Sequence, residues 1–326
     1  MRKGLVSIII VALAALAATL GWSIIPHHFT VASTAADLSV PKSSSDTQVS
    51  DRSPVSKTPV WTRDALSAIV HQHPVDSHAT WLLVGSDSRL GEAARSDAII
   101  IARINNDATR VMLFSIPRDT RVWVQGHGFT KLNHAMAYGG LNLLEKTIER
   151  NFSVSIDHAI AVDFTAFSKL IDAIGGVTMH VDKPLNYDDQ TDNTHIHIAQ
   201  GVQYFNGKEA LDYVRFRHDD AADIGRMKRH QELLQAIAHA HVPVSRWWDL
   251  TSTVLGISHH IQTDMKPWDV ISLAAKLTLA PNIHIQSRIL QGKSEVDQQD
   301  GLWYFYVDAR DAMAFRKQIA DFDRRG

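Results

Sequence analysis

Short apolar runs that end in charged residues dominate the pattern of this chain. Three of them, Trp81–Val84, Ala98–Ile104 and Val111–Ile116, are rich in β-branched or large apolar side chains, which predicts buried β-strands. Apolar residues that recur every three or four positions predict helices elsewhere. Further strands are expected at 158–162, 177–181, 283–290 and 302–307, and helices at 141–149, 164–174, 207–214, 226–239, 248–255, 268–279 and 309–320. Because strands and helices alternate, the fold class is α/β, with a central mixed sheet covered on both faces.

The N-terminal segment has the pattern of a membrane anchor. Leu5–Ile25 carries no charged residue, and Arg2 and Lys3 precede it. A helix of about 20 apolar residues spans the roughly 30 Å hydrocarbon core of a bilayer. We therefore predict a transmembrane signal-anchor at 5–25, with residues 1–4 on the cytoplasmic side because basic residues stay inside. A cleaved signal peptide is the alternative, although its apolar region is usually only about 7 to 15 residues long.

The rest of the chain divides into a linker and one folded unit. Residues 26–60 are rich in Ser and Thr and poor in large apolar side chains, which predicts a disordered extracellular stalk. Residues 61–326 show no internal repeat and no second boundary, so we expect a single extracellular domain. The predicted location is the cell membrane, with a single pass and the domain outside.

Composition excludes several classes of function. The chain has 326 residues, 33 basic and 35 acidic side chains and a net charge of -2, so it lacks the basic character of a nucleic-acid-binding protein. It contains no Cys, which excludes disulfides, thiolate metal sites and a Cys nucleophile. Any site for an anionic ligand must therefore be local.

Two carboxylates lie at the ends of neighbouring predicted strands. Asp87 follows the first strand and Asp97 precedes the second, and a chain reversal between the strands brings these ends together. Such a pair suits Mg²⁺, which takes its other ligands from water and substrate phosphates. The alternative is that each Asp pairs with Arg89 or Arg95 in a surface salt bridge.

A second charged group lies further along the chain. Arg215 and Arg217 flank Phe216 and share one face of an extended segment, and Arg226 lies at the start of a predicted helix, where anions are favoured. Together with Arg118 they would form a clamp for phosphate oxygens. The alternative is a solvated loop whose arginines are balanced by Asp219, Asp220 and Asp223.

Seven motifs in a fixed order carry a family resemblance. They are GSDSR, RSDAII, SIPRDT, KLNHAMAYGG, VDF followed by LIDAIGGV, GKEALDYVRFRHDD, and GRMKRHQ. Over roughly Trp81 to Ala240 the chain resembles the LytR-CpsA-Psr family of cell-wall glycopolymer ligases. The resemblance implies a three-layer α/β/α sandwich with a long apolar pocket for a polyprenyl tail. It also implies transfer of a phosphoryl-linked polymer, of teichoic acid or capsule type, from an undecaprenyl-pyrophosphate carrier to a peptidoglycan hydroxyl.

The resemblance also implies roles for individual residues. Asp87 and Asp97 match the ligands of Mg²⁺, for which Mn²⁺ is a substitute, and Arg118 and Asp97 match the catalytic pair. His230 stands where the family has a phosphate-contacting Gln, and bound phosphates would favour its charged form. The residues that match pyrophosphate contacts are Arg89, Lys131, Arg215, Arg217, Arg226, His230 and Gln231.

The same residues are also compatible with other functions. A hydrolase would use the same clamp to deliver water to a lipid pyrophosphate, and a non-enzymatic protein would bind the polyprenyl phosphate as a sensor. A transcriptional attenuator is a third alternative, but an outer domain without a basic helix-turn-helix is poorly suited to DNA. The expected partners are the lipid-linked glycopolymer, the peptidoglycan acceptor and membrane lipid, and no nucleic acid is expected.

Overall fold

The computed structural model describes most of the chain from Arg63 to Phe322. The described residues are 63–74, 79–87, 95–105, 109–189, 194–216, 222–240, 283–322 and, between the last two ranges, 252–253, 256–266, 269, 272–273, 275–276 and 279–280. The predicted anchor at 5–25 and stalk at 26–60 lie outside these ranges. Within them, no helix is both long enough and apolar enough to cross a membrane.

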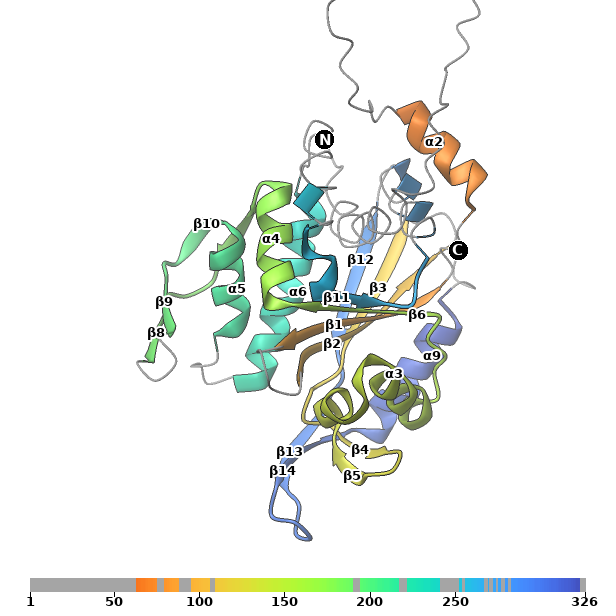
Figure 1. The fold of residues 1–326 in the computed structure, drawn as a ribbon. Coiled ribbons are helices and arrows are strands. Elements are labelled where there is room, and N and C mark those ends of the chain that lie inside the picture. Colours follow the sequence, from red (N-terminus) through yellow and green to blue (C-terminus); the bar gives the residue numbers. More distant parts are fainter. Residues whose placement is uncertain are drawn as a thin grey trace, which may run out of the picture.

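A six-stranded mixed sheet forms the centre of the fold (Figure 1). Its strands lie in the order β11-β6-β1-β2-β3-β12. β1 is parallel to β6 and β3 to β12, whereas β2 is antiparallel to both β1 and β3. The strands are β1 (Thr80–Asp87), β2 (Arg95–Ile104), β3 (Arg110–Ser115), β6 (His158–Asp163), β11 (Ile261–Thr263) and β12 (His284–Ile289).

Helices cover both faces of this sheet, which confirms a mixed α/β fold with a central mixed sheet (Figure 1). One face packs against α2, α4, α5 and α6, and the other against α3 and α9. The helices are α2 (Arg63–Gln72), α3 (Leu132–Phe152), α4 (Phe164–Ile174), α5 (Gly207–Arg215), α6 (Ala222–His239) and α9 (Ala309–Ala320).

The continuous apolar runs of β1 and β2 follow from burial on both faces. Trp81 and Ile100 belong to the core beneath α4, α5 and α6, whereas Leu82 and Ile101 belong to the core beneath α3 and α9. All four are at most 5% exposed. Successive side chains of a strand point to opposite faces, so each strand supplies both cores.

Local signals set the ends of the helices beside the sheet. The Asp163 carboxylate caps α4 by accepting from the backbone N–H of Ala166, and Gly175 ends that helix with a φ of 90°, a conformation that favours glycine. Asn206 and Glu209 form a reciprocal capping box at the start of α5.

Some expected boundaries were wrong. α3 begins at Leu132 instead of 141, and its backbone leaves helical geometry at Gly139 and Gly140. These glycines conceal the earlier turns, because they interrupt the apolar periodicity. The predicted helices at 248–255 and 268–279 fall largely outside the described residues.

Most strands of the short two-stranded sheets were also absent from the expected elements. They are short and partly exposed, so their apolar alternation is weak. The pairs are β4 (Arg121–Val124) with β5 (Gly128–Lys131), β7 (Val177–Val181) with β10 (Gly201–Phe205), β8 (Leu185–Asp189) with β9 (Thr194–Ile198), and β13 (Gly292–Val296) with β14 (Trp303–Val307). Of these strands, only β7 and β14 were predicted.

The close approach of α5 to α4 leads to a test of the packing. A Cβ added at Gly207 would lie 2.0 Å from the backbone oxygen of Ser168. We expect Gly207→Ala to lower the free energy of unfolding by about 1 to 3 kcal/mol, the usual cost of overpacking. Urea denaturation measures this change. Gly256→Ala is the control, because a Cβ there meets no atom of the described residues within 4 Å, and equal stability of the two variants would contradict the assignment.

Candidate active site

A β-bulge places the Asp97 carboxylate in the site. Gly85 pairs with Ala98 and Ser86 with Ser96, so Asp97 is an extra residue on β2. Asp97 and Ala98 both line the same pocket. In a regular strand two successive side chains would point to opposite faces. The bulge therefore turns Asp97 towards the helices α4 to α6.

Five alternating charges extend from α6 past Asp97, and we call them the charge row: Arg226, Asp97, Arg118, Asp119 and Lys131. Arg226 Nη1 lies 3.9 Å from Asp97 Oδ1, and Arg118 Nη1 donates to the same oxygen. Arg118 Nε lies 3.5 Å from Asp119 Oδ2, and Lys131 Nζ lies 3.1 Å from Asp119 Oδ1. Each carboxylate thus lies between two cations, which offsets the cost of burying the charges.

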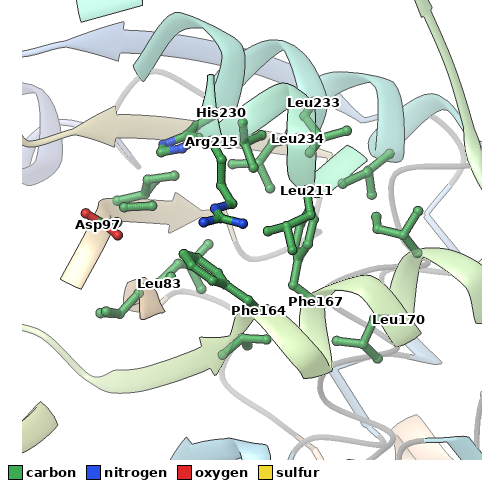
Figure 2. A pocket seen from close by; sticks show the side chains of 18 of the residues that line it. Leu83, Asp97, Phe164, Phe167, Leu170, Leu211, Arg215, His230, Leu233 and Leu234 are labelled. Carbon is green, nitrogen blue, oxygen red and sulfur yellow. The ribbon is translucent and has the colours of Figure 1, made fainter. Parts of the chain in front are cut away.

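An apolar pocket opens on one side of Asp97. It lies between the sheet and the helices α4, α5 and α6, and its volume, including the open mouth, is about 1230 Å³. Figure 2 shows Asp97, Arg215 and His230 towards one end, and leucine and phenylalanine side chains along the rest. The apolar lining includes Leu83, Ile100, Phe164, Phe167, Leu170, Leu211, Leu233, Leu234 and Ile237. The pocket therefore suits a ligand with a long apolar part and a charged end.

Three predicted residues from α5 and α6 lie at the polar end of this pocket. Arg215, Arg226 and His230 all line it, and Figure 2 shows Arg215 and His230 there. Arg226 is only 2% exposed, and the guanidinium of Arg215 lies 5.4 Å from the centre of the Phe164 ring. Arg226 and His230 lie one helical turn apart on α6, so both face the same side.

His230 is neutral in the protein without bound phosphate. Burial is the main cause that lowers the pKa of His230 to about 3, and the positive charge of Arg226 lowers it further. A hydrogen bond to the backbone of Val214 and the charge of Asp97 act in the opposite direction. The imidazole is neutral in the unliganded site because the ring faces an apolar cavity beside a guanidinium group, and the expectation that bound phosphates favour its charged form stays a prediction.

The Gln231 side chain makes its hydrogen bonds away from the pocket. Its Nε2 donates to Ser115 Oγ at 2.9 Å and to the backbone oxygen of Arg288 at 2.7 Å, and the residue is 8% exposed. It does not line the pocket. Gln231 thus anchors α6 to β3 and β12, and the structure does not bring it together with the pocket residues.

Of the remaining predicted residues, Lys131 and Asp87 are not among those that line the pocket, and two others lie outside the described part of the chain. Lys131 belongs to the charge row but does not line the pocket. Asp87 ends β1 opposite Arg95, on the same sheet edge as Asp97. Arg89 and Arg217 lie outside the described residues.

The two carboxylates at this sheet edge form the candidate metal site. Within the described part of the chain, no three His, Cys, Asp or Glu side chains form a group that could hold a metal ion. Asp87 and Asp97 are carboxylates of the type that Mg²⁺ sites use, in which one or two carboxylates hold the ion and water and substrate phosphates complete its ligands.

The sequence assigned no functional role to the residues of two parts of the site. Asp119 directly follows Arg118 in the SIPRDT motif and bridges it to Lys131, so adjacency to Arg118 was an available signal. The apolar residues of the pocket had no such signal. Phe167 and Leu211 have the same helical spacing as residues that pack fully against the sheet.

The neutral state of His230 leads to a prediction for stability. Its folded pKa of about 3 lies below its ordinary value of 6.5, so the unfolded chain gains the proton first as pH falls. We expect the protein to lose stability below about pH 6.5, and His230→Gln to lose less over the same range. Urea unfolding at several pH values measures both curves. Parallel curves for the two proteins would contradict the neutral assignment.

Comparison with known proteins agrees with this geometry. The chain is 30% identical over 245 residues to the polyisoprenyl-teichoic acid–peptidoglycan teichoic acid transferase TagU of Oceanobacillus iheyensis, covering 73% of this chain and 74% of that protein. A structure of TagT bound to LI-WTA matches with a TM-score of 0.60 and 28% identity, covering 74% of this chain and 89% of that one. TagT with bound octaprenyl pyrophosphate lipid matches with a TM-score of 0.56 and 27% identity, over the same shares of the two chains. Residues 40–321 match the LytR_cpsA_psr family, and the chain therefore belongs to the LytR-CpsA-Psr family.

Proposed function

We propose that this protein transfers a phosphoryl-linked glycopolymer, of teichoic acid or capsule type, from an undecaprenyl-pyrophosphate carrier to peptidoglycan. The observation that carries the proposal is the pocket, whose apolar walls end at Asp97, Arg215, Arg226 and His230. A polyprenyl pyrophosphate has the same two parts, an apolar chain and an anionic end. The names of its relatives, a teichoic acid transferase and a protein bound to octaprenyl pyrophosphate, support this function.

The donor would lie along the pocket with its pyrophosphate at the polar end. Burial of the polyprenyl chain against leucine and phenylalanine side chains provides affinity without requiring a particular chain length. Arg215 and Arg226 offer planar guanidinium donors to phosphate oxygens. His230, whose ring is neutral before the donor binds, adds a further contact at the same end of the pocket.

Phosphoryl transfer requires accurate positioning and neutralisation of charge more than a covalent nucleophile. Arg118 follows β3 and shares the Asp97 carboxylate with Arg226, so it lies where the charged end of the donor would enter. The guanidinium would exchange its bond to Asp97 for bonds to the transferred phosphoryl group. It would then neutralise the charge that develops on the phosphoryl oxygens.

A divalent cation completes the proposal. Asp87 and Asp97 would hold Mg²⁺, or Mn²⁺ in its place, through their carboxylate oxygens. When bound, the ion would neutralise phosphate charge as a Lewis acid. The proposed location is the outer side of the cell membrane, with residues 5–25 as a single-pass anchor and 26–60 as the stalk.

The first test removes the Arg118 guanidinium. We expect Arg118→Ala to lower the rate of polymer transfer by about 10² to 10³, since one electrostatic donor to a transition state usually contributes that much. The assay uses a lipid-linked substrate with and without a peptidoglycan acceptor. Phosphate release without transfer would instead favour a lipid-pyrophosphate hydrolase. Arg150→Ala is the control, because that exposed arginine stacks on Trp123 at 3.8 Å, outside the charge row. Equal rates for the two variants would refute the role of Arg118.

The second test concerns the metal. We expect Asp87→Asn and Asp97→Asn each to raise the Mg²⁺ concentration needed for activity, because each removes a charged oxygen ligand. The double variant should lose little more than the worse single variant, since both act through one ion. Activity is measured against Mg²⁺ concentration, with Asp182→Asn, directly after β7, as the control. Full activity in the presence of a chelator would show that no metal is required.

A further inference from the structure

The site has two sides, and the donor occupies one of them. Arg226, His230 and Asp97 line the pocket, whereas Arg118, Asp119 and Lys131 do not. In phosphoryl transfer the attacking and leaving oxygens lie roughly in line with phosphorus. With the carrier lipid in the pocket as proposed above, the leaving phosphate lies beside Arg215 and Arg226. The acceptor hydroxyl must then approach from the side of Asp119 and Lys131.

One titratable ring lies on that side. His134 is in the first turn of α3, whose N-cap is Lys131, and the backbone N–H of Asn133 in the same turn donates to the carbonyl oxygen of Arg118 at 3.0 Å. Burial lowers the pKa of His134, and the positive charges of Lys131 and Arg95 lower it further, while Asp119 opposes them. The imidazole is therefore neutral at physiological pH and lies within electrostatic reach of three charged residues around the site.

Contacts on two sides hold the ring in place. His134 Nδ1 lies 2.8 Å from Thr130 Oγ1, and Thr130 is 9% exposed. The ring of Tyr138 lies 5.8 Å from the His134 ring, tilted by 59°. When Nδ1 carries the proton and donates it to Thr130, the lone pair of Nε2 is free to accept another proton.

This side of the site is open to a large acceptor. Tyr138 is 48% exposed and Phe129 is 58% exposed. The Tyr138 ring stacks on His127 of the β4–β5 turn, with ring centres 4.0 Å apart. The exposed ring of Tyr138 lies beside His134, so a glycan strand can reach the imidazole without entering the lipid pocket.

We propose that His134 is the general base that takes the proton from the acceptor hydroxyl. The hydroxyl oxygen forms a bond to the phosphorus that carries the polymer, and its proton passes to Nε2 of His134. The bond between that phosphorus and the bridging oxygen breaks, and the carrier leaves as a lipid monophosphate with the electron pair. This inference rests on the proposed function and assigns the proton acceptor that the polymer transfer requires. Thr130 is a positioning residue, because it acts through the imidazole.

The main test compares His134→Gln with wild type. We expect kcat for polymer transfer to fall by about 10² to 10⁴, the usual contribution of a general base. Binding of a polyprenyl pyrophosphate in the pocket should be unchanged. We expect the wild-type rate to decline as pH falls, because the base becomes protonated, and we expect this decline to disappear in the variant. His180→Gln is the control, because that imidazole is exposed on β7, 63% of its side-chain surface being accessible.

A second variant separates chemistry from packing. His134→Ala should regain part of its activity when imidazole is added, because the free base occupies the space left by the side chain. Thr130→Val should lower kcat without changing donor binding. Wild-type activity in His134→Gln, or a loss that imidazole does not restore and that leaves the pH profile unchanged, would overturn the inference while leaving the proposed function in place. Absence of polymer transfer by the wild-type protein would overturn both.

Discussion

The arrangement of this site depends on the charge of Asp97. Its carboxylate accepts a hydrogen bond from Arg118 and lies 3.9 Å from Arg226, so it holds two guanidinium groups that would otherwise repel each other. These three residues come from β2, the turn after β3, and α6. Removal of the carboxylate would leave two largely buried positive charges without their shared counter-ion, which is costly in a protein interior. A single bulged residue thus joins three segments and places cations where an anionic substrate would enter.

The two faces of the sheet have different tasks. On one face, Leu82 and Ile101 are fully buried beneath α3 and α9. On the other, Leu83 and Ile100 line a pocket because α4, α5 and α6 do not close over them completely. The closely packed face holds the strand ends in fixed positions. The open face provides apolar volume next to those ends, so binding of a lipid chain and positioning of a phosphate use one rigid element.

The attachment of α6 to the sheet supports both tasks. Gln231 reaches from α6 to Ser115 at the end of β3 and to the backbone of Arg288 on β12. The residues on the adjacent face of the same helix, Arg226 and His230, consequently point into the pocket. A glutamine that the family resemblance assigns to phosphate binding contributes here by orienting the helix. The neutral His230 beside it agrees with a site whose positive charge comes from guanidinium groups.

The sequence by itself determined the long strands of the central sheet, the class of fold and the concentration of charge at one edge of the sheet. Asp87, Asp97 and Arg118 flank apolar runs. Charged groups cannot lie unpaired inside buried strands, so these residues must lie at the strand ends. Only the tertiary structure decided which of these charges share a pocket. The turn of Asp97 into the pocket depends on a one-residue shift in strand register, and the role of Gln231 depends on contacts with residues 116 and 57 positions away. Neither is encoded in local periodicity, because register and long-range contacts arise from the packing of the whole domain.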